Sequence, residues 1–154
     1  MRRRVLWATV LLIGVLLALG AAGPQVESDS TPADRVTLTV FDGEIAVGQV
    51  QARVADGPIE RYRGLSGVET LGPNEGMVFV YPAAGERSFV MRDMAVPLDI
   101  IFVGADRRVS AISHAAADDQ RQFVGQARWV IEVKRGYAAA HGIQAGDRVA
   151  GLPD

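Results

Sequence analysis

The sequence predicts a mostly-β fold: a small, largely antiparallel barrel or sandwich of about eight short strands with two short helices. Apolar and polar residues alternate in several short segments, as in strands with one buried face. Turn residues separate these segments at short intervals, which is typical of sandwiches and barrels. Only two short stretches have helical spacing. Because tight turns join antiparallel neighbours, we expect few parallel pairs.

The first predicted element is a β-hairpin over residues 36–54. Val36, Leu38 and Val40 alternate with residues of the opposite face, and Asp42-Gly43 favours a tight turn before the extended pattern resumes. A short helix is predicted next, because Pro58 suits the first helical position and glycines at 64 and 67 suit its end. We expect Ile59 and Tyr62 to face the core from this helix.

The later segments predict strands at residues 76–81, 87–92, 98–103, 108–113, 128–133 and 147–152. Pro82 is expected to end the first of them, since proline removes a ladder hydrogen bond. A helical turn is predicted at residues 137–141, before Gly142. The predicted core residues are Met91, Ile100, Phe102, Trp129 and Ile131.

Residues 1–23 are predicted to be a signal peptide or an N-terminal membrane anchor. Three arginines precede an uncharged apolar run over residues 5–23. That run is just long enough to span a bilayer core of about 30 Å, and small residues after position 18 would suit a cleavage site. Both alternatives stay open, and both place the rest of the chain outside the cytoplasm, secreted or anchored through residues 5–23.

The remainder divides into a flexible linker over residues 24–35, which is polar and contains two prolines, and one domain over residues 36–152. The chain has a formal net charge of −2, so nucleic acid is not an expected partner. It has no cysteine, which excludes disulfides, thiolate metal sites and a cysteine nucleophile.

The most interesting polar stretch is residues 92–99, which joins two predicted strands. Arg92, Asp93 and Asp99 are the candidate ligand-binding residues, because they could meet at one edge of the sheet. Asp93 and Asp99 would then be paired carboxylates or cation ligands. The structural alternative is that Asp99 accepts backbone hydrogen bonds or pairs with an arginine, since a buried carboxylate needs partners.

Other chemistry finds little support. His114 and His141 are the only histidines, and their spacing is not that of a zinc site. The chain has no Gly-x-Ser-x-Gly string and no glycine-rich phosphate loop. We therefore assign no catalytic residue, no metal ligand and no cofactor.

Five segments resemble, in order and spacing, those of the domain of unknown function family 192: residues 64–67 (GLSG), 75–82 (EGMVFVYP), 89–102 (FVMRDMAVPLDIIF), 129–133 (WVIEV) and 142–149 (GIQAGDRV). The resemblance implies a small β-rich domain, often attached to a signal or membrane segment. It carries over no catalytic residue, because the family's role is not established. The chain departs from the family's usual string at Val90, Asp93 and Met94, where Trp, Asn and Thr are usual.

Two functional hypotheses follow. The first is a non-enzymatic binding module for an envelope protein or a small ligand, because no set of nucleophile, base and orienting group is evident. The alternative is a hydrolase-like or metal-assisted enzyme that uses Asp93 and Asp99, together with His114. It requires these side chains to converge.

Overall fold

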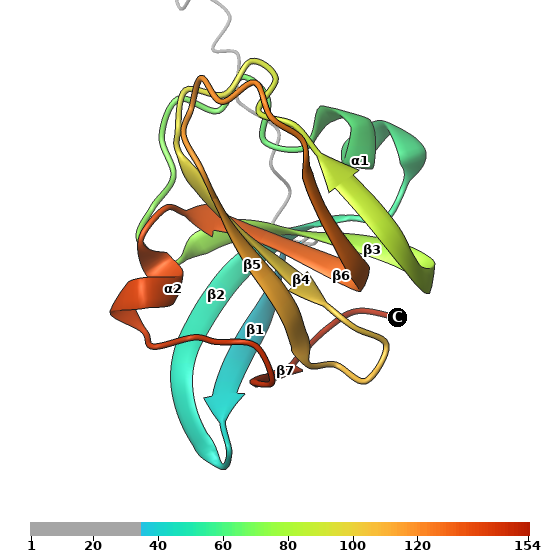
Figure 1. Cartoon of the computed structure of the whole chain (residues 1–154), viewed down its shortest axis with the longest axis vertical. Coiled ribbons are helices and arrows are strands. Elements are labelled where there is room, and N and C mark those ends of the chain that lie inside the picture. The colour runs from blue at the N-terminus through green and yellow to red at the C-terminus, as the bar shows by residue number, and fades with distance from the viewer. Residues whose placement is uncertain (1–34) are drawn as a thin grey trace, which may run out of the picture.

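The computed structural model describes residues 35–154. In this part of the chain, seven strands and two short helices follow one another as β1 (Arg35–Asp42), β2 (Ile45–Ala55), α1 (Pro58–Arg63), β3 (Glu75–Phe89), β4 (Leu98–Val103), β5 (Val109–Ala115), β6 (Phe123–Lys134), α2 (Tyr137–Ala140) and β7 (Arg148–Ala150). The strands form one sheet in the order β5-β4-β6-β3-β2-β1-β7, which curls into a half-barrel (Figure 1). The predicted mostly-β class is confirmed.

The sheet is antiparallel except where β2 pairs with β3. These two strands run parallel because the connection between them crosses over through α1 instead of making a tight turn. The curl brings the two edge strands together at one end, where Arg108 pairs with Arg148 and the amide of Val109 bonds to the carbonyl of Asp147.

The long strand β3 corrects one sequence expectation. Residues 76–81 and the first half of residues 87–92 belong to this single strand, and Pro82 does not end it. The register between β3 and β6 shifts between Val80 and Gly85, and Pro82 lies within that irregularity. Its missing N–H therefore costs no ladder hydrogen bond, and the bulge bends the strand.

Two hydrophobic cores lie on the two faces of the sheet. The first contains Ile101, Trp129 and side chains from both β1 and β7, so it fills the inside of the curl. The second contains Phe102 and Phe89 and lies on the other face. All six residues of β4 are buried because this strand is covered by both cores, which explains its unbroken apolar run. All five predicted core residues are buried.

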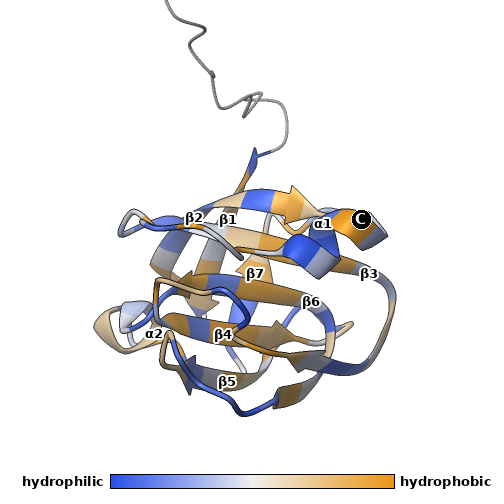
Figure 2. Cartoon of the chain, turned by 90° about the horizontal axis from the view of Figure 1, so that it is seen from above, coloured by the Kyte–Doolittle hydropathy of each residue, from blue (hydrophilic) through white to orange (hydrophobic). Residues whose placement is uncertain are grey.

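The hydropathy of the chain follows this arrangement. Strand β4 is largely hydrophobic along its length, β6 mixes hydrophobic and hydrophilic segments, and several loops at the rim are hydrophilic (Figure 2). Helix α1 is the exception to our expectation, because Ile59 and Tyr62 are 70% and 73% exposed and no residue of the helix is buried. Six residues make less than two turns, and Leu65, just after the helix, enters the second core instead.

Backbone contacts hold α1 in place where apolar packing does not. The guanidinium of Arg61 donates hydrogen bonds to the carbonyls of Asp56 and Val80, which ties the helix to the end of β2 and to β3. Within residues 35–154, no helix combines the length and the apolar character needed to span a bilayer. The predicted signal or anchor segment (residues 1–23) and linker residues 24–34 lie outside the described residues.

Candidate functional site

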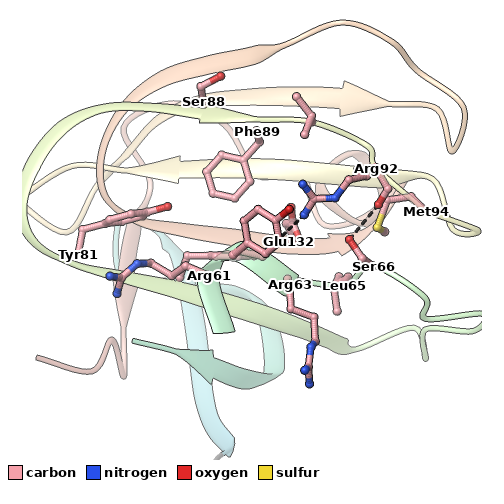
Figure 3. A pocket seen from close by; sticks show the side chains of 14 residues that line it. Arg61, Arg63, Leu65, Ser66, Tyr81, Ser88, Phe89, Arg92, Met94 and Glu132 are labelled. Carbon is pink, nitrogen blue, oxygen red and sulfur yellow. Dashed lines mark hydrogen bonds between the residues drawn. The ribbon is translucent and has the colours of Figure 1, made fainter. Parts of the chain in front are cut away.

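A cavity of about 190 Å³ opens between α1, β3, β6 and the turn after β3. Its walls are aromatic and cationic, and its lining residues are Arg61, Tyr62, Arg63, Gly64, Leu65, Ser66, Phe79, Tyr81, Ser88, Phe89, Val90, Arg92, Met94 and Glu132. We call this cavity the α1 pocket (Figure 3). It combines aromatic and other apolar side chains with charged and hydroxyl groups, and such a combination can both hold and orient a small molecule.

The polar group deepest in the α1 pocket is Glu132 of β6. This residue lies opposite Met77 of β3 and Ile100 of β4, so apolar side chains flank it on both sides. It is only 5% exposed. Among the described residues, no hydrogen bond or ion pair involves its carboxyl group. Desolvation therefore raises the pKa of Glu132 to about 8, and the acid is largely protonated at neutral pH.

Two arginines of the α1 pocket are held by backbone carbonyls and aromatic rings. Arg92 donates to the carbonyl of Tyr62 at 2.7 Å, and its guanidinium lies 4.2 Å from the centre of the Tyr62 ring. The guanidinium of Arg61 lies 5.2 Å from the ring centre of Tyr81 and donates to Val80. No carboxylate among the described residues forms an ion pair with either arginine. The pocket is therefore positively charged while Glu132 is protonated.

We predict that Glu132 makes the stability of the fold depend on pH. A group whose folded pKa of about 8 exceeds its unfolded value of 4.5 contributes stability that is complete below pH 4.5 and is lost as pH rises through 8. One titrating group can change the free energy of unfolding by at most about 1.4 kcal/mol per pH unit. The expected change is smaller than this maximum, because access of water to the pocket makes ionisation of Glu132 less costly. We expect the free energy of unfolding to fall by about 1 kcal/mol per pH unit between about pH 6 and 8.

Urea unfolding of the wild type and Glu132→Gln across this pH range measures the effect. The variant cannot ionise, so its stability should stay nearly constant while that of the wild type falls. The charged and titratable groups around Glu132 are shared by both proteins: Arg61, Tyr62 and Arg63 of α1, Tyr81 of β3 and Arg92 of the turn. Parallel pH profiles for the two proteins would contradict the assignment of the pH dependence to Glu132.

The structure separates the three residues proposed from the sequence. Arg92 lines the α1 pocket. Asp93, the next residue, is exposed in a turn with a positive φ of 53°, and its carbonyl accepts a hydrogen bond from the amide of Gly67. Asp99 is fully buried on β4, between cross-strand neighbours on β5 and β6, and does not line the α1 pocket.

Asp99 is occupied by structural hydrogen bonds. One carboxylate oxygen, Oδ2, accepts from the amides of Gly136 and Ala138 at 3.0 and 2.9 Å, which fixes the start of α2. The other oxygen, Oδ1, lies 2.7 Å from Nδ1 of His114 on the neighbouring strand β5. His114 itself is 52% exposed at its side chain. Asp99 and His114 therefore converge, and Asp99 also has the backbone partners that a buried carboxylate requires.

Sequence reasoning missed Glu132, although one pattern pointed to it. The alternation in residues 128–133 places Trp129, Ile131 and Val133 on one face, so Val130 and Glu132 must share the other. That face would be exposed in a sheet with one core. Here the second core covers it, and a carboxyl group becomes buried.

Two other hollows are larger but less suited to bind a ligand. One, of about 420 Å³, lies around Arg53 and Glu75, but Glu75 already accepts hydrogen bonds from Arg35 and from the amide of Gly72. The other, of about 350 Å³, is an open depression near His141. The α1 pocket differs from both, because a buried polar group without a partner reaches it.

Comparisons with known proteins agree with the fold. The chain matches the family model of the domain of unknown function 192, described as an uncharacterized ACR, over residues 39–151. A protein of unknown function from Novosphingobium aromaticivorans DSM 12444 is similar, with 34% identity and a TM-score of 0.71, over 88% of this chain and 98% of that one. A "putative transcription regulator" from Sinorhizobium meliloti 1021 shares the fold, with 22% identity and a TM-score of 0.72, over 77% of this chain and 95% of that one.

Among curated proteins, no match to this chain was found. The family match covers most of the described residues, and it includes every strand of the sheet at least in part. The segments that carry the resemblance also contribute to the α1 pocket, through Gly64, Phe79, Arg92 and Glu132. The chain belongs to the domain of unknown function family 192.

Proposed function

We propose that this chain is an extracytoplasmic, non-enzymatic binding module, and that the α1 pocket is its site for a small ligand. One observation carries the proposal. Glu132 is a buried carboxyl group without a partner, and it borders a cavity. Burying a polar group without a hydrogen bond costs about 1–3 kcal/mol in proteins, and a bound ligand would recover part of that cost.

The size and walls of the α1 pocket support a small ligand. Its volume of about 190 Å³ is below the roughly 300–1,000 Å³ of pockets that hold drug-sized molecules. Phe79 and Phe89 form an edge-to-face pair with ring centres 4.9 Å apart, so this part of the wall is rigid. A preformed wall favours affinity, since little side-chain freedom is lost on binding.

Binding is favoured over catalysis by the hydrogen bonds around the two candidate chemical groups. The hydroxyl of Ser66, in the α1 pocket, donates to the carbonyl of Arg92 at 2.9 Å, so no base takes its proton. Asp99 accepts hydrogen bonds from backbone amides at the start of α2, which supports a structural role instead of an acid–base role. The enzyme hypothesis retains one supporting observation, the contact between Asp99 and His114.

A ligand screen with two tryptophan variants tests the binding proposal. Ser88 is exposed and lines the α1 pocket, so Ser88→Trp should reduce the free volume. Val124 lies opposite Ser88 on β6, is 49% exposed and does not line the pocket, so Val124→Trp is the matched control. Thermal unfolding with a library of small anionic, neutral and cationic compounds should give stabilising hits for the wild type and the control.

The same hits should be weakened at least tenfold in Ser88→Trp, and nuclear magnetic resonance should recover each ligand chemically unchanged. Hits that stabilise all three proteins equally would refute the α1 pocket as the binding site. Conversion of a ligand to a product would refute the non-enzymatic role.

The location outside the cytoplasm rests on the three arginines followed by the apolar run over residues 5–23. Intact mass of the chain from separated membrane and soluble fractions tests this part. A full-length chain in the membrane would support a tethered module, and a chain shortened by about residues 1–23 would support a secreted one. A full-length chain recovered only from the cytosol would contradict export.

A further inference from the structure

We infer that the ligand of the α1 pocket is a small organic anion: a carboxylate attached to a flat apolar body. The inference rests on the binding role proposed above and adds the chemical class of the ligand. It depends on the arginines without carboxylate partners, the carboxyl group of Glu132 and the rings of the pocket wall.

The arginines of the α1 pocket favour an anionic ligand. The four ion pairs among residues 35–154 use Arg35, Arg107, Arg121 and His114, and none uses an arginine of the α1 pocket. Arg92 donates one N–H to the carbonyl of Tyr62. This hydrogen bond orients the guanidinium and leaves its other N–H donors free. A guanidinium with free donors fits a carboxylate through paired, charge-assisted hydrogen bonds. In Figure 3, the side chains of Arg63 and Arg61 extend away from Glu132, whereas the guanidinium of Arg92 lies on the side of Glu132, so Arg92 is the cation best placed to meet a ligand.

The protonated carboxyl group of Glu132 also favours an anionic ligand. A protonated carboxylic acid has one O–H to donate, and the described residues provide no acceptor for it. The oxygen of an anionic ligand would accept this hydrogen bond while its charge faces the arginines. A cationic ligand would need Glu132 ionised and would be repelled by Arg61 and Arg92. The same pocket thus favours an anion and disfavours a cation.

The aromatic rings of the pocket wall favour a ligand with a flat apolar body. Tyr62, Tyr81, Phe79 and Phe89 contribute aromatic rings, and the volume of about 190 Å³ leaves room for a body of about one ring. A bare inorganic anion would leave this apolar wall in water. A carboxylate with a flat apolar body would cover the wall and satisfy the polar groups at once.

Fluorine NMR of the full chain in non-ionic detergent, with a micelle-only blank, tests the inference. The probes are 4-fluorobenzoate, its neutral analogue 4-fluorobenzamide, and inorganic phosphate as a competitor without an apolar body. We expect 4-fluorobenzoate to bind at least about tenfold more tightly than the amide, because a hydrogen bond to a charged group exceeds a neutral one by about that factor. Phosphate should compete weakly.

Four substitutions test which side chains recognise the ligand. Arg92→Gln should weaken 4-fluorobenzoate about tenfold and leave 4-fluorobenzamide unchanged. Arg135→Gln is the matched charge control and should change neither, because Arg135 is exposed and does not line the α1 pocket. Glu132→Leu removes the donor and should weaken the benzoate, while Glu132→Gln retains N–H donors and should restore most of the affinity. Circular dichroism of each variant should confirm that it is folded.

The outcomes separate the two proposals. If the amide binds as tightly as the benzoate, and Ser88→Trp weakens both, the binding site stands and the anion preference is wrong. If neither probe binds, the inference is wrong, and the compound screen alone then decides whether the α1 pocket binds anything. If Arg135→Gln weakens the benzoate as much as Arg92→Gln does, general surface charge explains the binding, and the specific contact with Arg92 is wrong.

Discussion

Phe102→Ala should lower the free energy of unfolding by about 3–5 kcal/mol, because the ring is fully buried in the second core. The ring lies edge-to-face with Phe89, with ring centres 6.1 Å apart, and fills the space over Gly125 of β6. Its removal leaves a cavity that neighbouring strands cannot close, since β4 is bonded on both sides. Urea unfolding of the two proteins measures the loss.

Gly125 supplies the matched experiment, because a Cβ added there would lie 2.5 Å from Cγ of Phe102. Gly125→Ala should therefore destabilise the wild type by about 1–3 kcal/mol and cost much less in the Phe102→Ala background. Gly85→Ala is the control, since its Cβ would have no neighbour closer than 3.5 Å. A loss below about 1 kcal/mol for Phe102→Ala, or additive costs in the double variant, would show that the ring is not packed against β6 in this way.

Asp99→Ala should also lower the free energy of unfolding by about 3–5 kcal/mol. The substitution removes a fully buried carboxylate, so two backbone amides and His114 lose their hydrogen-bond acceptor. The two amides belong to Gly136 and Ala138. Loss of their hydrogen bonds should make the start of α2 more mobile, together with the residues of α2 that enter the first core. Chemical denaturation measures the global loss.

Two variants identify which hydrogen bonds matter. Asp99→Asn keeps a carbonyl oxygen for the amides and should recover much of the stability. His114→Ala removes only a half-exposed partner and should cost about 1 kcal/mol or less. If His114→Ala were as damaging as Asp99→Ala, the Asp99–His114 contact would outweigh the backbone bonds, and the enzyme hypothesis would gain support.

Much of the fold follows from local patterns. The alternation in β1, the turn at Asp42-Gly43 and the unbroken apolar run of β4 each fix an element, because each pattern is compatible with few backbone conformations. The continuity of β3 through Pro82 could not be predicted, because it depends on where the register with β6 shifts. The exposure of Ile59 and Tyr62 was missed because helical spacing does not tell whether a neighbour exists to cover that face.

The candidate site was only partly predictable. The polar stretch between two predicted strands indicates Arg92 as a ligand-binding residue, and Arg92 does line the α1 pocket. Asp99 was weighed as a buried carboxylate that needs partners, and the structure supplies backbone partners for it. Glu132 was missed because its burial depends on the second core. Val90 and Met94, where the chain departs from the family's string, both line the pocket, so ligand preference can differ between members.

The contrast between β4 and α1 has a consequence for motion. Every residue of β4 is buried and the strand is bonded to β5 and β6, so its amides should exchange with solvent only through global unfolding. Helix α1 has no buried residue, so it can open at a small fraction of that free energy. Arg61 and Tyr62 on α1 would move with it, while Glu132 stays fixed in the sheet. The α1 pocket therefore has one wall that can fluctuate locally, through which a ligand can enter without loosening either core.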